Sequence, residues 1–477
     1  MYQDVQLYID GVWGPSADGR VIDIPCPANG EILGTVAHAT VADLDRAIAA
    51  AEKGFQIWRK VPNLERAMIL RKAAALITER GETMAQLISM EQGKPLLESR
   101  DEVYRVADNC EWMAGECQRI YGRTIAARAG NVHQMVIKEP VGPVAVFTPW
   151  NFPVNQLIRK VAAALAAGCS VIAKAPEETP ASCAEMVRAF HNAGLPAGVL
   201  NLVYGTPAQI SEHLLAHPSI RKISFTGSTA VGKQLAAMAG RYMKLSTMEL
   251  GGHGPVAVFD DCDLPTSVAR MAGAKFRNAG QVCTSPTRFN VQTPIYDQFV
   301  ELFVNAANAV KVGDSLDATT TMGPLANPRR VQAMESLIAD AVQRGATVKT
   351  GGKRIGNTGN FFEPTVLTDV PLDARVMNEE PFGPLALIRR FDTMDEVVTE
   401  ANRVPYGLAA YAFTTSSQKA NEFTARVESG MVSVNHFGIG QAETPLMGVK
   451  DSGYGYESGA EGIEAYLQSR FITMADL

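Results

Sequence analysis

The 477-residue sequence predicts an α/β fold in which a doubly wound, mostly parallel sheet carries helices on both faces. From residue 140 onward, short apolar runs alternate with longer amphipathic segments. The connections between these segments are short, as in right-handed βαβ units. Small and polar residues follow several of the apolar runs, and ligands of doubly wound sheets bind beyond the carboxyl ends of the strands.

The individual elements follow from their start and stop signals. A buried strand is predicted at 143–148, followed by a helix at 154–167 that Gly168 ends. The same pattern repeats along the chain, where Gly194 ends a second helix. The remaining predicted strands are 170–174, 199–204, 222–226 and 245–250, and the remaining helices of this region are 180–192, 208–216 and 230–239.

A second α/β segment begins near Gly252 and extends to about residue 434, with helices predicted at 264–278 and 295–312. Before the sheet, 41–56 and 63–80 are predicted to form amphipathic helices with acidic residues in their first turns. The sequence contains no internal repeat, low-complexity tract or long linker. Two domains that share a cleft, with short arms, are the simplest arrangement.

The composition excludes several classes of function. An apolar content of 46% with 20% charged residues is typical of a soluble globular protein. The net charge of −6 and the lack of a basic run argue against nucleic-acid binding. The longest apolar run, 161–173, is too short to cross about 30 Å of hydrocarbon as a helix. Seven cysteines without a CxxC pair favour neither a disulfide framework nor a zinc site. With no signal-peptide pattern at the start, we expect a cytoplasmic protein without a metal ion.

Three segments carry candidate catalytic residues. Cys283 lies in segment 280–284, thirty-four residues after Glu249. A thiol is a strong nucleophile, and a nearby carboxylate can act as a general base. Asn151, in segment 148–153, offers a neutral amide that could stabilise an oxyanion. Each residue also has a non-catalytic interpretation. Cys283 could be an inert buried thiol, Glu249 a surface carboxylate at a strand end, and Asn151 the N-cap of a helix.

Together these segments resemble the aldehyde dehydrogenase superfamily over nearly the whole chain. The resemblance implies that the Cys283 thiolate adds to an aldehyde and that Asn151 and the Cys283 N–H bind the resulting oxyanion. Hydride then leaves to a nicotinamide, and Glu249 activates the water that hydrolyses the thioester. Glu249 could also deprotonate the thiol.

The resemblance also implies a domain organisation. A doubly wound Rossmann-type NAD domain would comprise 1–118 and 139–251, and an α/β catalytic domain 252–447. A β oligomerisation arm would comprise 119–138 and 466–477. We expect a homo-oligomer, a dimer or a tetramer, that acts on a small aldehyde.

The dinucleotide site lacks the usual GxGxxG signal, because the glycine pairs near 438–440 and 453–455 neither follow a strand nor open a helix. A strand does run into a helix through Gly227 and Ser228, which is a weak signal alone. The resemblance identifies this turn as the pyrophosphate loop, and it implies that Lys174 contacts the adenosine ribose and Glu177 its hydroxyls. Because a carboxylate would repel a 2′-phosphate, NAD is expected over NADP. The resemblance adds Thr148, Pro149, Trp150, Gly251, Glu380 and Phe382 as cofactor-binding residues.

Two arginines and a glutamine are the candidate substrate-binding residues. Arg159 lies eight residues after Asn151, and Arg277 lies six residues before Cys283. Guanidinium groups bind carboxylates through paired hydrogen bonds. Both positions match arginines of succinic semialdehyde dehydrogenases, and nearby segments resemble 2-oxoglutarate semialdehyde dehydrogenases, in which case Gln156 would bind a keto or carboxyl oxygen. The alternative to a substrate-binding role is that Arg159 and Arg277 are ordinary surface residues of helices.

Two other activities stay open. Segment 445–450 departs from the usual family pattern, and an enlarged or more apolar entrance would suit uncharged aliphatic or aromatic aldehydes. A thiol hydrolase would need a histidine base, and His253 is the one histidine near a catalytic segment in the sequence.

Overall fold

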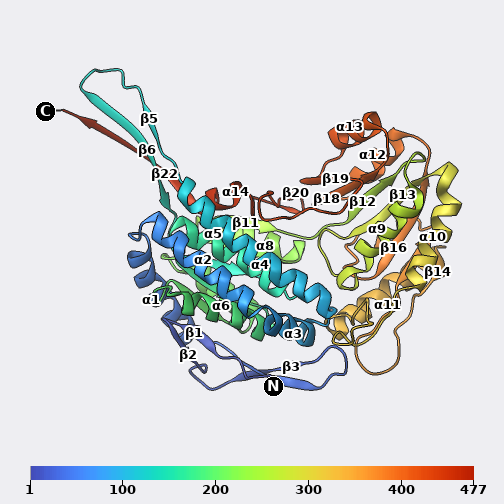
Figure 1. Cartoon of the computed structure of the whole chain (residues 1–477), viewed down its shortest axis with the longest axis horizontal. Coiled ribbons are helices and arrows are strands. Elements are labelled where there is room, and N and C mark those ends of the chain that lie inside the picture. Colours follow the sequence, from blue (N-terminus) through green and yellow to red (C-terminus); the bar gives the residue numbers. More distant parts are fainter. Residues whose placement is uncertain (1, 477) are drawn as a thin grey trace.

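The computed structural model describes residues 2–476 and contains two helix-covered sheets and a projecting three-stranded arm (Figure 1). The first sheet has the strand order β2-β1-β9-β8-β7-β10-β11-β21. Its five inner strands, β9 to β11, are parallel, and the strands at its two edges are antiparallel. The strand bounds are β1 Leu7–Ile9, β2 Val12–Gly14, β7 Val144–Phe147, β8 Val171–Lys174, β9 Leu200–Val203, β10 Lys222–Thr226, β11 Leu245–Glu249 and β21 Gly453–Tyr454.

The strand order reverses between β7 and β10. The chain runs from β7 outward to β8 and β9, then crosses to the other side of β7 for β10 and β11. Right-handed crossovers therefore place the connecting helices on opposite faces of the sheet. The carboxyl ends of β7 and β10 form the switch point at which doubly wound sheets bind ligands. The predicted doubly wound α/β fold is confirmed.

Helix α5 is the most enclosed helix of this domain. It packs on β7 and β8, and helices α2 and α4 cover its outer side, so that all its residues except Asn155 are buried. Gly168 ends it in the left-handed conformation, as predicted. The helices of this domain are α1 Val41–Trp58, α2 Asn63–Glu79, α3 Gly81–Gln92, α4 Leu96–Glu116, α5 Pro153–Ala167, α6 Pro180–Ala193, α7 Pro207–Ala216 and α8 Thr229–Arg241.

The second sheet has the order β14-β15-β16-β13-β12-β18-β19, and it is parallel except at β14. Its strands are β12 Gly254–Val258, β13 Pro286–Gln292, β14 Thr347–Thr350, β15 Thr365–Thr368, β16 Leu385–Phe391, β18 Ala409–Phe413 and β19 Met431–Val434. Its helices are α9 Leu264–Phe276, α10 Tyr296–Asn308, α11 Pro328–Gln343, α12 Met394–Asn402 and α13 Ser417–Arg426.

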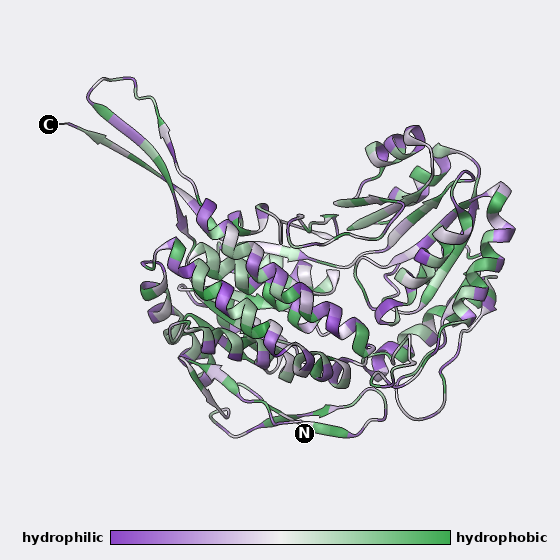
Figure 2. Cartoon of the chain, in the orientation of Figure 1, coloured by the Kyte–Doolittle hydropathy of each residue, from purple (hydrophilic) through white to green (hydrophobic). Residues whose placement is uncertain are grey.

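The arm consists of β5 (Arg123–Ile125), β6 (Val132–Pro140) and β22 (Leu467–Ala475), in the order β22-β6-β5. It extends away from both domains (Figure 1), and hydrophobic residues recur along it (Figure 2). Phe471 and Met474 are about half exposed on β22. The small elements are β3 Val21–Pro25, β4 Ile32–Ala37, β17 Tyr406–Gly407, β20 Val449–Lys450 and α14 Glu461–Glu464. Within residues 2–476, no helix combines the length and the apolar character that crossing a membrane requires.

Two sequence-based boundaries are wrong. The helix predicted at 264–278 ends at Phe276, because Asn278 and Ala279 have φ of 49° and 51°, which no right-handed helix accommodates. The helix predicted at 295–312 ends at Asn308. Helices α3 and α4 were absent from the sequence-based assignment.

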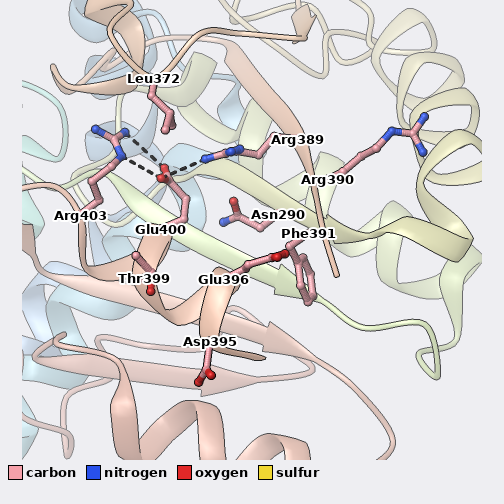
Figure 3. Close-up of a pocket in the computed structure, with 10 residues that line it drawn as sticks. All are labelled: Asn290, Leu372, Arg389, Arg390, Phe391, Asp395, Glu396, Thr399, Glu400 and Arg403. Carbon is pink, nitrogen blue, oxygen red and sulfur yellow. Dashed lines mark hydrogen bonds and ion pairs between the residues drawn. The ribbon is translucent and has the colours of Figure 1, made fainter. Parts of the chain in front are cut away.

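A cavity of about 380 Å³ lies between β16 and α12, and none of the predicted catalytic residues lines it (Figure 3). At its edge the buried Glu400 carboxylate accepts hydrogen bonds from Arg403 at 2.8 Å and Arg288 at 3.1 Å, and it pairs with Arg389 at 3.0 Å. Arg288 is almost completely buried, and burial lowers its pKa to about 10. Glu400 therefore balances a guanidinium charge within the core of the second domain.

Glu400→Gln is expected to lower the free energy of unfolding by about 3 to 5 kcal/mol, since it leaves the buried Arg288 charge uncompensated. Asp395→Asn is the matched control, because Asp395 forms an ion pair with Arg426 but is 83% exposed, and it should cost under about 1 kcal/mol. Urea unfolding measures both. Equal effects of the two variants would show that Glu400 is no more important than a surface carboxylate.

Candidate active site

The switch point of the first sheet gathers several of the predicted cofactor residues. Thr148, Pro149 and Trp150 follow β7, and Gly227 and Ser228 join β10 to α8. The Ser228 side chain caps α8 by accepting from Val231 N, so the helix N-terminus with its unpaired N–H groups faces this edge. A side chain at Gly227 would lie 2.4 Å from the Phe225 ring, so only glycine fits. This is the arrangement of an anion-binding loop.

Lys174, the last residue of β8, forms an ion pair with Glu177 at 2.6 Å. Glu177 also accepts from Gly205 N at 3.0 Å. Both side chains are largely enclosed, with 6% and 19% exposed, so they do not form an ordinary surface ion pair. Both lie next to the switch point, on the neighbouring strand and its loop.

Residues of the second domain approach the same edge. Glu380 accepts from Gly252 N at 2.9 Å, and burial raises the pKa of its carboxyl to about 7. A side chain at Gly251 would lie 2.6 Å from a Glu380 oxygen, so the two loops touch. Phe382 and Trp150 meet edge to face with ring centroids 5.6 Å apart. The structure therefore brings Glu380 and Phe382 together with Trp150 and Gly251, as the predicted cofactor role requires.

Glu249 is the last residue of β11 and is 3% exposed. Both of its carboxyl oxygens are buried and have no hydrogen-bond partner among residues 2–476. Burial, followed by the nearby Glu457 carboxylate, raises its pKa well above the usual value, while Lys160 and Arg159 oppose this shift. Such a carboxyl group is poised to hold a proton and to release it when water or charge enters the site.

Cys283 lies directly against the loop that follows Glu249. A Cβ atom at Gly252 would lie 2.3 Å from the Cys283 carbonyl oxygen, so glycine permits the contact. Burial, and then the carboxyls of Glu380 and Glu249, raise the pKa of the thiol to about 12. Arg159 has the opposite effect on this pKa. The predicted base, Glu249, therefore lies close enough to the predicted nucleophile for its charge to raise the pKa of the Cys283 thiol.

The chain enters this loop through three consecutive left-handed residues. Asn278, Ala279 and Gly280 have φ of 49°, 51° and 70°. For the two non-glycine residues this backbone conformation is unfavourable, and such strain clusters at functional sites. A side chain at Gly280 would lie 2.1 Å from Gly383 O, so the turn is pressed against the loop that follows Phe382.

Asn151 is 2% exposed and is held beside the cysteine loop. Its side-chain amide donates to Gln281 O at 3.1 Å, and its Oδ1 has no partner among residues 2–476. A side-chain amide carries two N–H groups, so one remains to stabilise an oxyanion.

The candidate substrate residues differ in their surroundings. Arg159 is 3% exposed on α5, where it donates to Ser458 Oγ and Gly440 O. Its charge acts on both Cys283 and Glu249, so the alternative of a surface arginine is wrong here. Gln156, on the same helix, is 6% exposed. Arg277 is half-buried, beyond the end of α9, with its guanidinium 5.1 Å from the centre of the Phe152 ring.

Three further residues near the site carry no recognisable signal in the sequence. Lys94 donates to Asn151 O at 2.7 Å, and its ion-pair partner is Glu102 at 2.6 Å. Asn278 also donates to Asn151 O, at 2.9 Å. A lysine and a glutamate in an amphipathic N-terminal region are ordinary surface residues by pattern, and only the tertiary contacts reveal their burial. Among residues 2–476, no group of three or more His, Cys, Asp and Glu side chains is arranged to hold a metal ion.

His253 does not serve the cysteine. Its two ring nitrogens contact Thr287 Oγ1 at 2.6 Å and Val376 O at 3.0 Å. Burial holds the pKa of the ring well below its usual value. Both nitrogens are engaged within the second domain, so the base that a thiol hydrolase needs is not supplied by this histidine.

This chain is similar to several curated dehydrogenases over nearly its full length. The 4-(hydroxymethyl)benzenesulfonate dehydrogenase of Comamonas testosteroni is 46% identical over 99% of this chain and 98% of its own. The 3-sulfolactaldehyde dehydrogenase of Pseudomonas putida is 41% identical over 98% and 96%. The NADP⁺-dependent succinate-semialdehyde dehydrogenase of Escherichia coli K12 is 41% identical over 98% and 97%.

A solved structure has the same fold. The succinate-semialdehyde dehydrogenase of Burkholderia pseudomallei superposes with a TM-score of 0.97, at 41% identity, over 99% of this chain and 98% of that one. Residues 13–472 match the aldehyde dehydrogenase family. With its doubly wound sheet, its cysteine loop and these full-length similarities, the chain belongs to the aldehyde dehydrogenase family.

Proposed function

We propose that this NAD(P)-dependent oxidoreductase converts an acidic semialdehyde, such as succinic or 2-oxoglutarate semialdehyde, to the dicarboxylic acid through Cys283. The observation that carries the proposal is the buried Arg159 guanidinium, whose charge acts on both Cys283 and Glu249. The largest opposite charge acting on Arg159 is the Glu457 carboxylate, which also binds the buried Lys160. One carboxylate shared by two buried cations leaves one positive charge to be compensated by a further anion. The substrate carboxylate would supply that anion.

The names of similar proteins support an anionic substrate. The relatives from Comamonas testosteroni and Pseudomonas putida are named for sulfonates, and the Escherichia coli relative for a carboxylate. Each named compound carries a fixed negative charge at neutral pH. A guanidinium group pairs with either type of anion. An aldehyde that bears a sulfonate is therefore a variant of the same proposal.

The site residues divide the chemistry among them. Cys283 adds to the aldehyde carbon, and the free N–H of Asn151 with the Cys283 backbone N–H binds the oxyanion. Bound NAD(P) supplies the hydride acceptor. Glu249 takes a proton from water as that water attacks the thioester, and its raised pKa makes its carboxylate form a stronger base. The close loop packing at Gly252 and Gly280 holds the partly buried thiol between the two loops.

The residues at the switch point fit a dinucleotide. The Gly227 turn leaves the N-terminus of α8 free for a pyrophosphate, and the buried Thr148 hydroxyl has no partner among residues 2–476. Lys174 and Glu177 would hold the adenosine ribose, and Glu380 the nicotinamide ribose. NAD is proposed as the preferred cofactor because Glu177 would repel a 2′-phosphate.

An uncharged aromatic or aliphatic aldehyde is the second candidate substrate. Phe437 packs on Tyr411 and Phe413 with ring centroids 4.6 and 5.4 Å away, and these rings form an apolar wall in the second domain.

The half-exposed Phe471 and Met474 on the arm support a homo-oligomer, in which a partner subunit would cover them.

Arg159→Met is expected to reduce kcat/KM for succinic and 2-oxoglutarate semialdehydes by about 10- to 100-fold, the value of a hydrogen bond to a charged group. Butanal and benzaldehyde carry no anion, so their turnover should lose only the smaller contribution that Arg159 makes by lowering the thiol pKa, and the ratio of acidic to uncharged substrate turnover should fall. Arg344→Met, at an exposed ion pair beyond α11, is the control. NADH formation at 340 nm measures each rate. If Arg159→Met leaves the preference between acidic and uncharged aldehydes unchanged, the uncharged aldehydes become the better candidate substrates.

Glu177→Gln is expected to raise the ratio of kcat/KM with NADP to that with NAD by about 10-fold, or ~1.4 kcal/mol, because it removes a like charge from the ribose site. Glu178→Gln is the matched control, since Glu178 pairs with Arg329 at 2.9 Å on the protein surface. Initial rates with each cofactor measure the ratio. An equal change in both variants would remove Glu177 from the cofactor site.

The alkylation rate of Cys283 by iodoacetamide, without cofactor, is expected to rise about tenfold per pH unit from pH 7 to 10, because the thiolate fraction rises this way below the thiol pKa. This follows from the pKa of about 12, which burial and the two carboxyls raise. Mass spectrometry of the Cys283 peptide measures the rate, with Cys283→Ser as the blank. A plateau near pH 8 would contradict the raised pKa.

A further inference from the structure

A buried lysine connects the predicted oxyanion residue to the rest of the fold. Lys94 follows the end of α3 at Gly93 and is 1% exposed. Its ammonium group donates to Glu102 on α4 at 2.6 Å and to the main-chain oxygen of Asn151 at 2.7 Å. It also lies 3.9 Å from the centre of the Phe152 ring. An ammonium group so fully enclosed is rare unless it is paired.

The same ion pair fixes the first turn of α5. One oxygen of Glu102 binds Lys94, and the other accepts from the backbone N–H groups of Val154 and Asn155, both at 3.1 Å. These N–H groups have no partner inside the helix. Lys94 and Glu102 together therefore hold the chain on both sides of Phe152, from Asn151 to Asn155.

Asn278 ties this assembly to the cysteine loop. Its side-chain amide donates to Asn151 O at 2.9 Å and to Gln281 O at 3.2 Å. The Asn151 side chain donates to the same Gln281 oxygen, at 3.1 Å. Asn278 N is held in turn by Glu98 of α4, at 2.8 Å. A closed set of hydrogen bonds thus joins Asn151 to the segment that carries Cys283.

Lys94 is the only charged donor to the Asn151 main-chain oxygen among the hydrogen bonds of residues 2–476. Asn278 alone would leave that oxygen with a single neutral partner in a buried site. An oxyanion donor must be held to within about 0.5 Å of its productive position to be effective. The ammonium supplies this restraint through a charge-assisted hydrogen bond, which is stronger than a neutral one.

We infer that Lys94 is a positioning residue that holds Asn151 against the Cys283 loop. Lys94 thereby sets the rate at which Cys283 adds to the carbonyl carbon, and it does not set the affinity for the cofactor. This inference rests on the proposed role of Asn151 as the oxyanion donor. It assigns the position of Asn151 to a side chain whose ammonium group binds Glu102 and the Asn151 main-chain oxygen.

Lys94→Met keeps a long unbranched side chain but removes the ammonium group. We expect kcat for aldehyde oxidation to fall about 10- to 100-fold, less than the loss of an oxyanion donor itself, while the KM for NAD changes less than about 2-fold. Acylation by p-nitrophenyl acetate should fall in parallel without cofactor. In that reaction Cys283 sulfur bonds to the acetyl carbon, p-nitrophenolate leaves, and the thiol proton passes to solvent.

A double-mutant cycle with Asn151→Ala separates positioning from a general structural effect. If Lys94 acts through Asn151, Lys94→Met should cost less than about 2-fold in acylation rate when the Asn151 side chain is already absent. An undiminished 10- to 100-fold loss in the Asn151→Ala background would overturn the inference.

Two variants control for lost stability. Lys222→Met removes another buried ammonium, which binds Thr247 Oγ1 at 2.6 Å at the first residue of β10, the end of the strand opposite the catalytic edge. It should lower stability without lowering kcat. Lys94→Met with Glu102→Gln leaves no unpaired carboxylate and should recover stability but not kcat. Recovery of kcat in this double variant would overturn the inference, as would failure of both Lys94 variants to fold.

The outcomes also separate this inference from the proposed function. If Asn151→Ala acylates at the wild-type rate, the oxyanion role of Asn151 is wrong. If Asn151→Ala is slow and Lys94→Met is not, only the role of Lys94 is wrong.

Discussion

The close approach of the Gly252 loop to the Cys283 carbonyl is the constraint on which the active site depends. The two residues belong to segments on either side of the boundary between the sheets, and a single Cβ at Gly252 would lie 2.3 Å from that carbonyl. Gly251 against Glu380, and Gly280 against Gly383, repeat this close packing. The glycines at 252 and 280 thus let backbone segments pack directly against one another, and a methyl group at either position would force these segments apart.

Enclosure then sets the electrostatics. Burial favours the neutral forms of both the Glu249 carboxyl and the Cys283 thiol. The buried cations Lys160 and Arg159 lie close enough to lower the pKa of Glu249. Lys160 is itself held by Glu457 and Thr226. Burial therefore favours the neutral forms of Glu249 and Cys283, whereas the nearby cations favour their ionised forms.

The same enclosure accounts for the proposed preference for anions. Arg159 is held by Ser458 and Gly440, and the opposite charges that act on it are Glu457, Cys283 and Glu249, in that order. A guanidinium in this position favours a substrate that brings a negative charge. Carboxylate and sulfonate both satisfy it, which agrees with the mixture of compounds in the names of similar proteins.

The sequence alone determined the alternating elements of the first sheet, the glycine stops at 168 and 194, and the family, because these signals are local in the chain. Its periodicity could not reveal where α9 ends, since the left-handed turn at Asn278 is stabilised by distant partners. Only the tertiary structure decided that Arg159 is buried, that His253 is engaged elsewhere, and that Lys94 reaches Asn151 across 57 residues of sequence. Helix caps and hydrophobic periodicity depend on residues within a few turns of each other, so they can be recognised in the sequence. The partner of a buried charge depends on how distant segments pack, so it cannot be recognised in the sequence.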